Sequence, residues 1–258
     1  REYMVTGNAM CRKKEEIAMY EAEVAKLQKI IDESQNIVFF GGAGCSTESG
    51  IPDFRSAKGI YTNNRSAEEI VSHSYFFQNP ERFYRFYKDK MMFLDAKPNA
   101  CHQYFAKLQE TKNVTIVTQN IDGLHQLAGS LKVYELHGSI HRNYCLKCGK
   151  FFDANYVYDF KGVPYCDKCG GMIKPDVVLY EEPLDEEVIY GAIKAIENSD
   201  LLIVGGTSLN VYPAAGFIRY YHGVKLVNIN LDDNHLTNCL NIKAPIAEVF
   251  KKITEDTK

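Results

Sequence analysis

Residues 36–50 read NIVFFGGAGCSTESG and join a short, continuously apolar run to a glycine-rich turn. The run at 36–40 contains residues that favour strands, and the glycines follow it at once. Glycines after a strand let the backbone approach a phosphate closely, and the N-terminus of a following helix attracts anions. The stretch therefore favours a strand leading into a nucleotide-binding loop, although on its own such a glycine turn is often only a turn.

Further apolar runs occur along the chain, separated by segments with helical periodicity. The runs expected to form strands cover residues 114–118, 131–136, 201–204 and 225–230. Apolar residues recur every three or four positions in the expected helices, which cover 13–34, 98–110, 184–198 and 247–253. This alternation predicts an α/β fold with a mostly parallel sheet, and the continuously apolar strands predict helices on both of its faces.

The composition is that of an ordinary globular protein, with 258 residues, 45% of them hydrophobic and 24% charged. The net charge of −3 gives no general attraction to nucleic acid, and no apolar run is long enough to cross a membrane. We therefore expect no direct binding to nucleic acid and no membrane association. The start carries no secretory signal, so we expect a cytoplasmic protein in which residues 1–12 are a tag or a disordered start.

Two cysteine pairs form a motif of high specificity. Cys145-x-x-Cys148 is followed after 17 residues by Cys166-x-x-Cys169, and a glycine comes directly after each pair. Two disulfides or a redox pair are the alternatives, but a reducing compartment disfavours them. Four thiolates in two such knuckles suit tetrahedral zinc, and they leave no coordination position open. The motif predicts a structural Zn²⁺ that performs no chemistry.

The cysteine-rich stretch interrupts the α/β pattern. Residues 138–175 have no long apolar period, so we expect a small zinc-binding module inserted into the sheet domain. The sheet domain is expected to comprise residues 13–52, 80–137 and 176–258. Residues 53–79 between its parts are mixed and loop-like, and we expect a cofactor-binding loop with a small helical part there.

Polar motifs follow several of the apolar runs, where ligands bind in parallel α/β sheets. Residues 118–125 read TQNIDGLH and offer amide and carboxylate groups to ribose hydroxyls or a carboxamide, although an Asx turn explains them equally well in isolation. His137 begins an HGS motif, and its ordinary pKa suits proton transfer near neutrality. Residues 205–209 (GGTSL) and Asn230 add hydroxyl and amide groups at the same sheet edge.

The remaining histidines and cysteines carry no such pattern. We expect surface or satisfied core histidines at His73, His102, His125, His141, His222 and His235. Cys11, Cys101 and Cys239 have no ligand spacing and are interpreted as filler. Cys45 lies inside the glycine-rich loop, where a buried apolar filler and a reactive thiolate remain alternatives.

Taken together, these motifs resemble those of the sirtuins, the NAD-dependent protein lysine deacylases. The order GAG-x-S-x-x-SGIPDFRS, TQNIDGLH, HGS, CxxC…CxxC, GTSL and IN runs from Gly42 to Asn230, about three quarters of the chain. The resemblance implies a large Rossmann-like domain, a small zinc-binding domain and NAD in the cleft between them. It also suggests a prokaryotic-type, single-domain member of the family.

The resemblance implies roles for individual residues, with His137 as the general base. The residues implied in NAD binding are Ala43, Thr47, Phe54, Arg55, Gln119, Asn120, Ile121, Asp122, Ser208 and Asn230. An extended acylated peptide would add as a strand between the segment of Val178 and Tyr180 and the stretch around Val211. At residues 180–181, this chain has Tyr-Glu where the family more often has Phe-Gly.

A helical Tyr-x-x-Arg marks sirtuins that favour succinyl or malonyl lysine, and residues 83–88 match that stretch. Tyr84 fills the tyrosine place and Tyr87 the arginine place, so both are expected to line the acyl tunnel. A buried carboxylate without a cationic partner is costly. We therefore expect acetyl-lysine, or a longer neutral acyl chain, to be preferred over succinyl-lysine.

The family mechanism begins with attack of the acyl-lysine amide oxygen on C1′ of the nicotinamide ribose, which expels nicotinamide. His137 then activates a ribose hydroxyl that attacks the alkylimidate, giving free lysine and 2′-O-acyl-ADP-ribose. The alternatives are a mono-ADP-ribosyltransferase that uses the same NAD chemistry and a non-enzymatic NAD-sensing scaffold. The intact His137 and the peptide-pairing segment favour the deacylase over both.

Overall fold

The computed structural model describes residues 2–53 and 67–257, with side chains described from Glu15 onward in the first helix. A six-stranded parallel sheet in the order β3-β2-β1-β7-β8-β9 forms the body. Its strands are β1 (Asn36–Gly41), β2 (Asn113–Thr118), β3 (Val133–Glu135), β7 (Leu201–Gly205), β8 (Leu226–Ile229) and β9 (Leu240–Ile242). The predicted parallel sheet is confirmed, and the short β9 is an addition to the predicted strands.

Helices cover both faces of this sheet, as the apolar strands predicted. Ile37 and Phe39 of β1 pack in a core with α1 (Glu2–Asp32), α5 (Ala100–Leu108) and α9 (Ile246–Asp256). The alternate residues Val38 and Phe40 pack on the opposite face with α8 (Glu186–Glu197) and the 3₁₀ segment η3 (Ala214–Tyr220). Side chains of a strand point alternately to the two faces, so one apolar strand supplies both cores.

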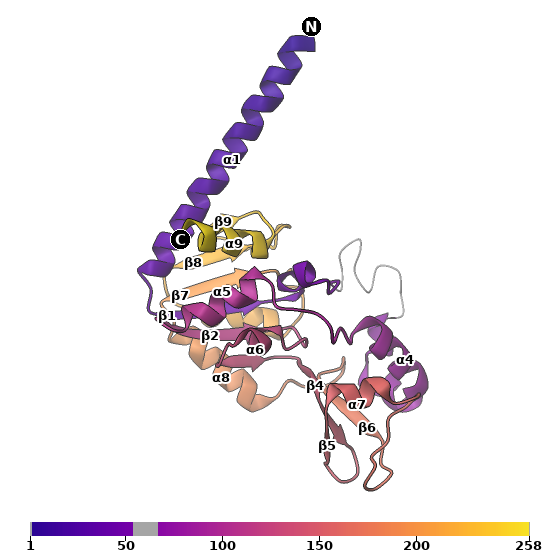
Figure 1. Cartoon of the computed structure of the whole chain (residues 1–258). Helices are drawn as coiled ribbons and strands as arrows, with labels where there is room; N and C mark the ends of the chain where they lie inside the picture. Colours follow the sequence, from indigo (N-terminus) through magenta and orange to yellow (C-terminus); the bar gives the residue numbers. More distant parts are fainter. Residues whose placement is uncertain (1, 54–66, 258) are drawn as a thin grey trace.

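Helix α1 is longer than its predicted counterpart. It begins at Glu2, whereas the periodicity indicated a start at Lys13. Figure 1 shows its N-terminal part projecting away from the body, while Val24, Leu27 and Ile31 near its end are buried against the sheet. Whether the first residues are a tag stays a prediction. No helix within residues 2–53 and 67–257 has the length and apolar character needed to cross a membrane.

A second, smaller layer lies beside one end of the sheet (Figure 1). Its three-stranded sheet has the order β5-β4-β6, and α7 (Ala154–Asp159) packs against it. The strands are β4 (Gly138–Cys145), β5 (Phe151–Phe152) and β6 (Ile173–Val177). The layer shares one hydrophobic core with α3 (His73–Gln78) and α4 (Pro80–Lys90).

The position of α4 differs from the expected division of the chain. Residues 80–137 were expected in the sheet domain, but α4 packs its aromatic side chains against the zinc-binding module. Phe83, Tyr84 and Tyr87 are fully buried there together with Ile173 of β6. The module has too few apolar residues for a core of its own, and α4 supplies the missing aromatic ones.

The strand order locates the region in which a ligand can bind. Strand β1 lies between β2 and β7, so the chain leaves β1 toward one side of the sheet and later continues on the other. Loops diverge at the carboxyl ends of strands around such a switch point and leave a crevice. The short elements η1 (Ala43–Cys45), η2 (Thr47–Ser49), α2 (Ala67–Ile70) and α6 (Leu124–Ala128) lie in the connections.

Candidate functional site

A cleft of about 760 Å³ opens at the carboxyl ends of the central strands and continues along residues 177–182. It brings together motifs that are far apart in the sequence. The residues singled out by sequence that line it are Ala43, Thr47, Gln119, Asn120, Ile121, His137, Val178, Tyr180, Ser208, Val211 and Asn230. The cleft therefore joins the expected NAD contacts and the expected peptide contacts in one space.

The glycine-rich loop after β1 is pressed against the turn after β7. Gly42 N–H donates to the Gly205 carbonyl at 3.2 Å, and Gly44 N–H donates to the Gly206 carbonyl at 2.8 Å. A Cβ atom on Gly44 would lie 2.7 Å from the Gly206 Cα, so a side chain cannot be accommodated there without moving the backbone. The glycines thus allow two loops to meet at the floor of the cleft.

His137 is half-buried at the end of β3 and faces the cleft. Its Nδ1 lies 2.9 Å from the Gln119 carbonyl oxygen, which can only accept a hydrogen bond. Nδ1 therefore carries the proton in the neutral ring, and Nε2 keeps its lone pair. Burial lowers the pKa of His137 below 6.5, and the Gln119 carbonyl opposes this shift in part. The ring is consequently neutral near pH 7 and able to accept a proton at Nε2.

Amide side chains after β2 and β8 are held by the neighbouring loops. Gln119 Nε2 donates to Thr207 Oγ1 at 3.0 Å, and Asn120 Nδ2 donates to the Gly42 carbonyl at 3.0 Å. Asn230 Oδ1 accepts from Thr207 N–H at 2.8 Å. Thr207 thus connects the two sides of the cleft floor. Thr207 was not among the predicted site residues, although it lies in the GGTSL motif.

Asp122 lies behind the cleft lining and is bound into a polar chain. Its Oδ2 accepts from Ser46 Oγ at 2.6 Å, and Ser46 Oγ lies 3.5 Å from His102 Nε2. His102 Nδ1 accepts from Asn99 N–H, and burial lowers the pKa of His102 to about 4, against the opposing charge of Asp122. His102 is therefore a neutral core histidine, but one that supports a residue expected to contact NAD.

The expected peptide-pairing segment contacts His137 and the start of α3. Val178 N–H donates to the His137 carbonyl at 2.9 Å, which places this segment directly beside the expected general base. Tyr180 forms a bridge with residue Ser72, donating to the Val71 carbonyl and accepting from His73 N–H. Val211 also lines the cleft, so a gap between the two expected pairing segments is present.

Three predicted contacts among the described residues do not line the cleft, namely Asp122, Tyr84 and Tyr87. Phe54 and Arg55 lie outside the described residues. Tyr84 and Tyr87 are fully buried in the core that α4 shares with the zinc-binding module. Tyr84 Oη donates to the Ile173 carbonyl, because the helical face shared by the two tyrosines is turned toward β6. Their role in an acyl tunnel stays a prediction.

The four motif cysteines converge at one end of the small sheet. Their sulfur atoms all lie within 4.8 Å of one another, with 3.4 Å between Cys145 and Cys169 and 3.7 Å between Cys148 and Cys166. These distances exclude disulfides, whose S–S bond is about 2.05 Å. Zinc–sulfur bonds of about 2.3 Å give a tetrahedron with edges of roughly 3.8 Å. The cluster therefore fits a structural Zn²⁺, and Gly149 and Gly170 turn with positive φ after each pair.

Cys45 is fully buried beneath the glycine-rich loop, and its Sγ contacts the Gly205 carbonyl at 3.3 Å. This packing favours the buried filler over the reactive thiolate, because a reagent reaches it only if the loop opens. His125 is likewise buried, and its ring packs against His102 and Phe39.

The sequence is similar to that of a known protein family and of bacterial enzymes. Residues 42–213 match the Sir2 family. An NAD-dependent protein deacetylase of Clostridium acetobutylicum is 61% identical over 214 residues, which cover 81% of this chain and 87% of the relative. One of Staphylococcus epidermidis is 43% identical over 219 residues, 83% of this chain and 89% of the relative.

Solved structures agree in fold over nearly the whole chain. A structure described as showing the mechanism and regulation of Sir2 enzymes has a TM-score of 0.82 and 38% identity, covering 92% of this chain and 98% of its own. A Sir2 variant with a deacetylated p53 peptide and 3′-O-acetyl ADP ribose has a TM-score of 0.81 and 36% identity, covering 90% and 97%. With the family match, the close relatives and the shared fold, the chain belongs to the Sir2 family.

Proposed function

We propose that this chain removes acyl groups, acetyl above all, from the lysines of proteins and peptides in a reaction that consumes NAD. The observation that carries this proposal is the position of His137. Its Nε2 is free to accept a proton in the cleft, while its main-chain carbonyl binds Val178 of the peptide-pairing segment. The curated relatives, which are NAD-dependent protein deacetylases, support the same reaction.

NAD would lie along the carboxyl ends of the strands. The glycine-rich loop with Ala43 and Thr47 would take the phosphates, because its backbone can approach them closely. Ser208 and Asn230 would reach the adenosine half, and residues 119–122 the nicotinamide ribose. When bound, NAD supplies an electrophilic ribose carbon whose nicotinamide can leave.

His137 would act as the base of the reaction. The neutral ring holds its proton on Nδ1 against the Gln119 carbonyl, so Nε2 can take a proton from a ribose hydroxyl. The lowered pKa keeps this form populated near neutral pH. The products would be free lysine, nicotinamide and 2′-O-acyl-ADP-ribose. The peptide main chain would add as a strand between the segment of Val178 and Tyr180 and the stretch around Val211.

The zinc would hold the small layer against α4 and would take no part in the chemistry, because protein sulfur fills its four positions. We place the reaction in the cytoplasm, since free zinc-binding thiolates require a reducing compartment.

The test is to incubate the protein with an acetyl-lysine peptide, with and without NAD, and to follow the products by mass spectrometry. We expect deacetylated peptide, nicotinamide and acetyl-ADP-ribose in equal amounts, and only when NAD is present. ADP-ribose carried on a protein with the acetyl groups retained would instead identify a mono-ADP-ribosyltransferase. No turnover of NAD would leave a binding protein and overturn the proposal.

A further inference from the structure

Glu181 adopts a backbone conformation that residues with a side chain rarely take. Its φ of 75° lies in the left-handed region, where glycine is usual and the Cβ of other residues is crowded. The residue lies in the wall of the cleft, directly after Tyr180 of the peptide-pairing segment. A glutamate at this position needs an interaction that offsets its unfavourable backbone.

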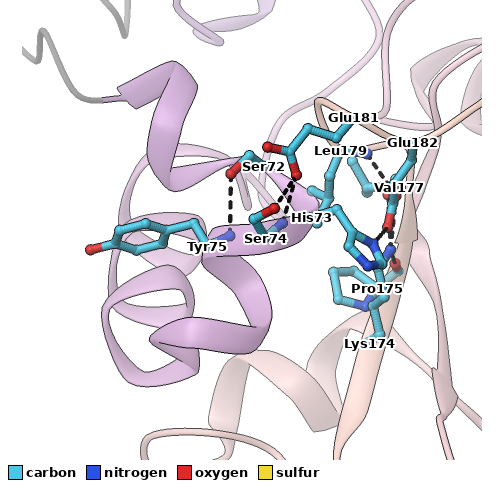
Figure 2. Close-up of polar contacts among 10 residues, drawn as sticks. All are labelled: Ser72, His73, Ser74, Tyr75, Lys174, Pro175, Val177, Leu179, Glu181 and Glu182. Atoms are coloured by element: carbon cyan, nitrogen blue, oxygen red, sulfur yellow. Dashed lines mark hydrogen bonds and ion pairs between the residues drawn. The ribbon is translucent and has the colours of Figure 1, made fainter.

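The carboxylate of Glu181 supplies that interaction. Its Oε2 accepts hydrogen bonds from Ser74 N–H at 2.8 Å and from Ser74 Oγ at 2.7 Å (Figure 2). Hydrogen bonds to an ionised acceptor are about twice as strong as neutral ones. Accordingly, the two bonds from Ser74 lower the pKa of the Glu181 carboxyl. The side chain therefore spans from the cleft wall to the first turn of α3.

Tyr180 and Glu182, on either side of Glu181, also connect the cleft wall to the start of α3. Tyr180 donates to the Val71 carbonyl at 3.1 Å and accepts from His73 N–H at 2.9 Å, so its peptide groups are occupied. Glu182 Oε1 lies 2.9 Å from His73 Nδ1. The main-chain N–H and C=O of Glu181, by contrast, form no hydrogen bond within residues 2–53 and 67–257. The main-chain N–H and C=O of Glu181 are thus available for hydrogen bonds to a ligand in the cleft.

We propose that Glu181 is a positioning residue, whose carboxylate, held by Ser74, fixes the left-handed bend that offers the residue-181 main chain to the acyl-lysine peptide. This inference rests on the proposed function, because it assigns a task within peptide binding. A glycine would reach the same bend but would also populate many others. The glutamate replaces that freedom with a defined conformation, which lowers the conformational entropy lost when the peptide binds.

Two other roles for Glu181 make different predictions. A residue that only stabilises α3 would change the thermal transition without changing the KM for the peptide. A residue that pairs with a basic side chain of the substrate through its second oxygen would matter only for peptides that carry lysine or arginine near the acyl-lysine. The positioning role predicts a higher peptide KM for peptides with and without such a residue.

The experiment measures kcat and both KM values for the wild type and for Glu181→Gly, Ser74→Ala and the double variant. Two acetyl-lysine peptides are used, one with neutral flanking residues and one with basic ones. We expect Glu181→Gly to raise the peptide KM about tenfold for both peptides, with kcat and the KM for NAD within about twofold of the wild type. Ser74→Ala should raise it about threefold, and should add nothing in the Glu181→Gly background.

Glu181→Gln provides the conservative control, because its amide oxygen can still accept from Ser74. It should keep the peptide KM within about threefold of the wild-type value. An unchanged peptide KM in Glu181→Gly, an equal rise in the KM for NAD, an effect confined to the basic peptide, or full additivity of the two substitutions would each overturn the proposal. Failure of the proposed function is separate from these outcomes, because the wild type would then show no NAD-dependent deacetylation.

Discussion

The two walls of the cleft are built by different kinds of interaction. The sheet wall is fixed by main-chain contacts between adjacent strand ends, such as Gln119 N–H to the Gly41 carbonyl at 2.9 Å. The opposite wall, formed by residues 71–74 and 174–182, also has main-chain contacts, but charged side chains add to them (Figure 2). There, Glu182 Oε2 accepts from Leu179 N–H at 2.9 Å and lies 3.2 Å from Lys174 Nζ (Figure 2).

This difference assigns separate tasks to the two walls. Backbone pairing in a buried sheet gives the sheet wall a geometry that depends little on pH or salt. Burial raises the pKa of the Glu182 carboxyl. Hydrogen bonds from His73 and the Leu179 N–H, together with the charge of Lys174, outweigh burial and lower this pKa below 4.5. The Glu182 carboxylate therefore stabilises the fold above pH 4.5, and this stabilisation is lost as the pH falls through the lowered pKa. The wall formed by residues 71–74 and 174–182 should therefore loosen in acid before the sheet does.

Removal of zinc is the strongest test of this division. Without metal, the four cysteines lose the ion that joins them, and the layer that shares its core with α4 loses its main support. We expect all measurable deacetylation to disappear. Hydrogen exchange should show β4, β6 and α4 exchanging rapidly while β1 and β2 stay protected.

Restoring zinc to the metal-free protein should recover both the activity and the protection, which serves as the control. If the protection of β4 and β6 and the rate of deacetylation survived a verified loss of metal, the second wall would be self-supporting and the structural role of zinc would be wrong.

His137→Ala tests the sheet wall, where the fold should survive and the chemistry should not. The substitution removes the proton acceptor at Nε2, so we expect kcat to fall about 100- to 10,000-fold. The thermal transition and the binding of NAD should change little. His235→Ala is the matched control, because His235 also lines the cleft but its side chain is 89% exposed. Activity of His137→Ala within tenfold of the wild type would contradict its role as base.

The sheet wall was largely predictable from the sequence. Buried parallel strands leave continuous apolar runs, and their carboxyl ends place the following motifs side by side. His137 and Asn120 were identified in this way, and the structure brings them together at one cleft. The cysteine spacing predicted the cluster for a related reason, since two knuckles bring four sulfur atoms within reach of one ion.

The second wall, formed by residues 71–74 and 174–182, could not be predicted, because its contacts join segments with no shared sequence pattern. The Glu181–Ser74 contact spans 107 residues of sequence and depends on one backbone angle. Strand β4 has no regular alternation and β5 has only two residues, and α4 completes the core that they share with β6. The helical spacing of Tyr84 and Tyr87 placed both on one face, but it could not tell that this face packs against β6 rather than lining the cleft.

The acyl preference depends on which side chains of α4 reach the cleft. No cationic side chain of α4 lines the cleft in the part of the chain that the structure describes. Arg85 is exposed, and Lys88 Nζ is held by the Gly162 carbonyl at 2.9 Å. A succinyl carboxylate would lose water without gaining a cation. We expect kcat/KM for acetyl-lysine to exceed that for succinyl-lysine by at least about tenfold on the same peptide.

A butyryl-lysine peptide separates the charge of the acyl group from its length. It should be processed far better than the succinyl peptide, because both chains have four carbons and only one is charged. A succinyl value equal to or above the acetyl value would mean that a basic residue reaches the acyl group.

The smallest expected effect distinguishes the two buried tyrosines of α4. Tyr84 Oη donates to the Ile173 carbonyl of β6, so Tyr84→Phe should lower the free energy of unfolding by about 1 kcal/mol. Tyr87 Oη is buried without a hydrogen-bond partner among the described residues, so Tyr87→Phe removes a desolvated hydroxyl and should leave stability unchanged or slightly higher. Urea unfolding of the zinc-bound proteins measures both.

The same pair of variants tests whether either hydroxyl serves the acyl group. A hydroxyl that only packs in the core should be lost without a change in kcat/KM for acetyl-lysine, provided that the variant is folded. The unpaired hydroxyl of Tyr87 is the one with hydrogen-bonding capacity to spare. A fall in kcat/KM in Tyr87→Phe with unaltered stability would therefore show that the acyl group reaches α4. The core between α4 and the small sheet would then also contact the substrate.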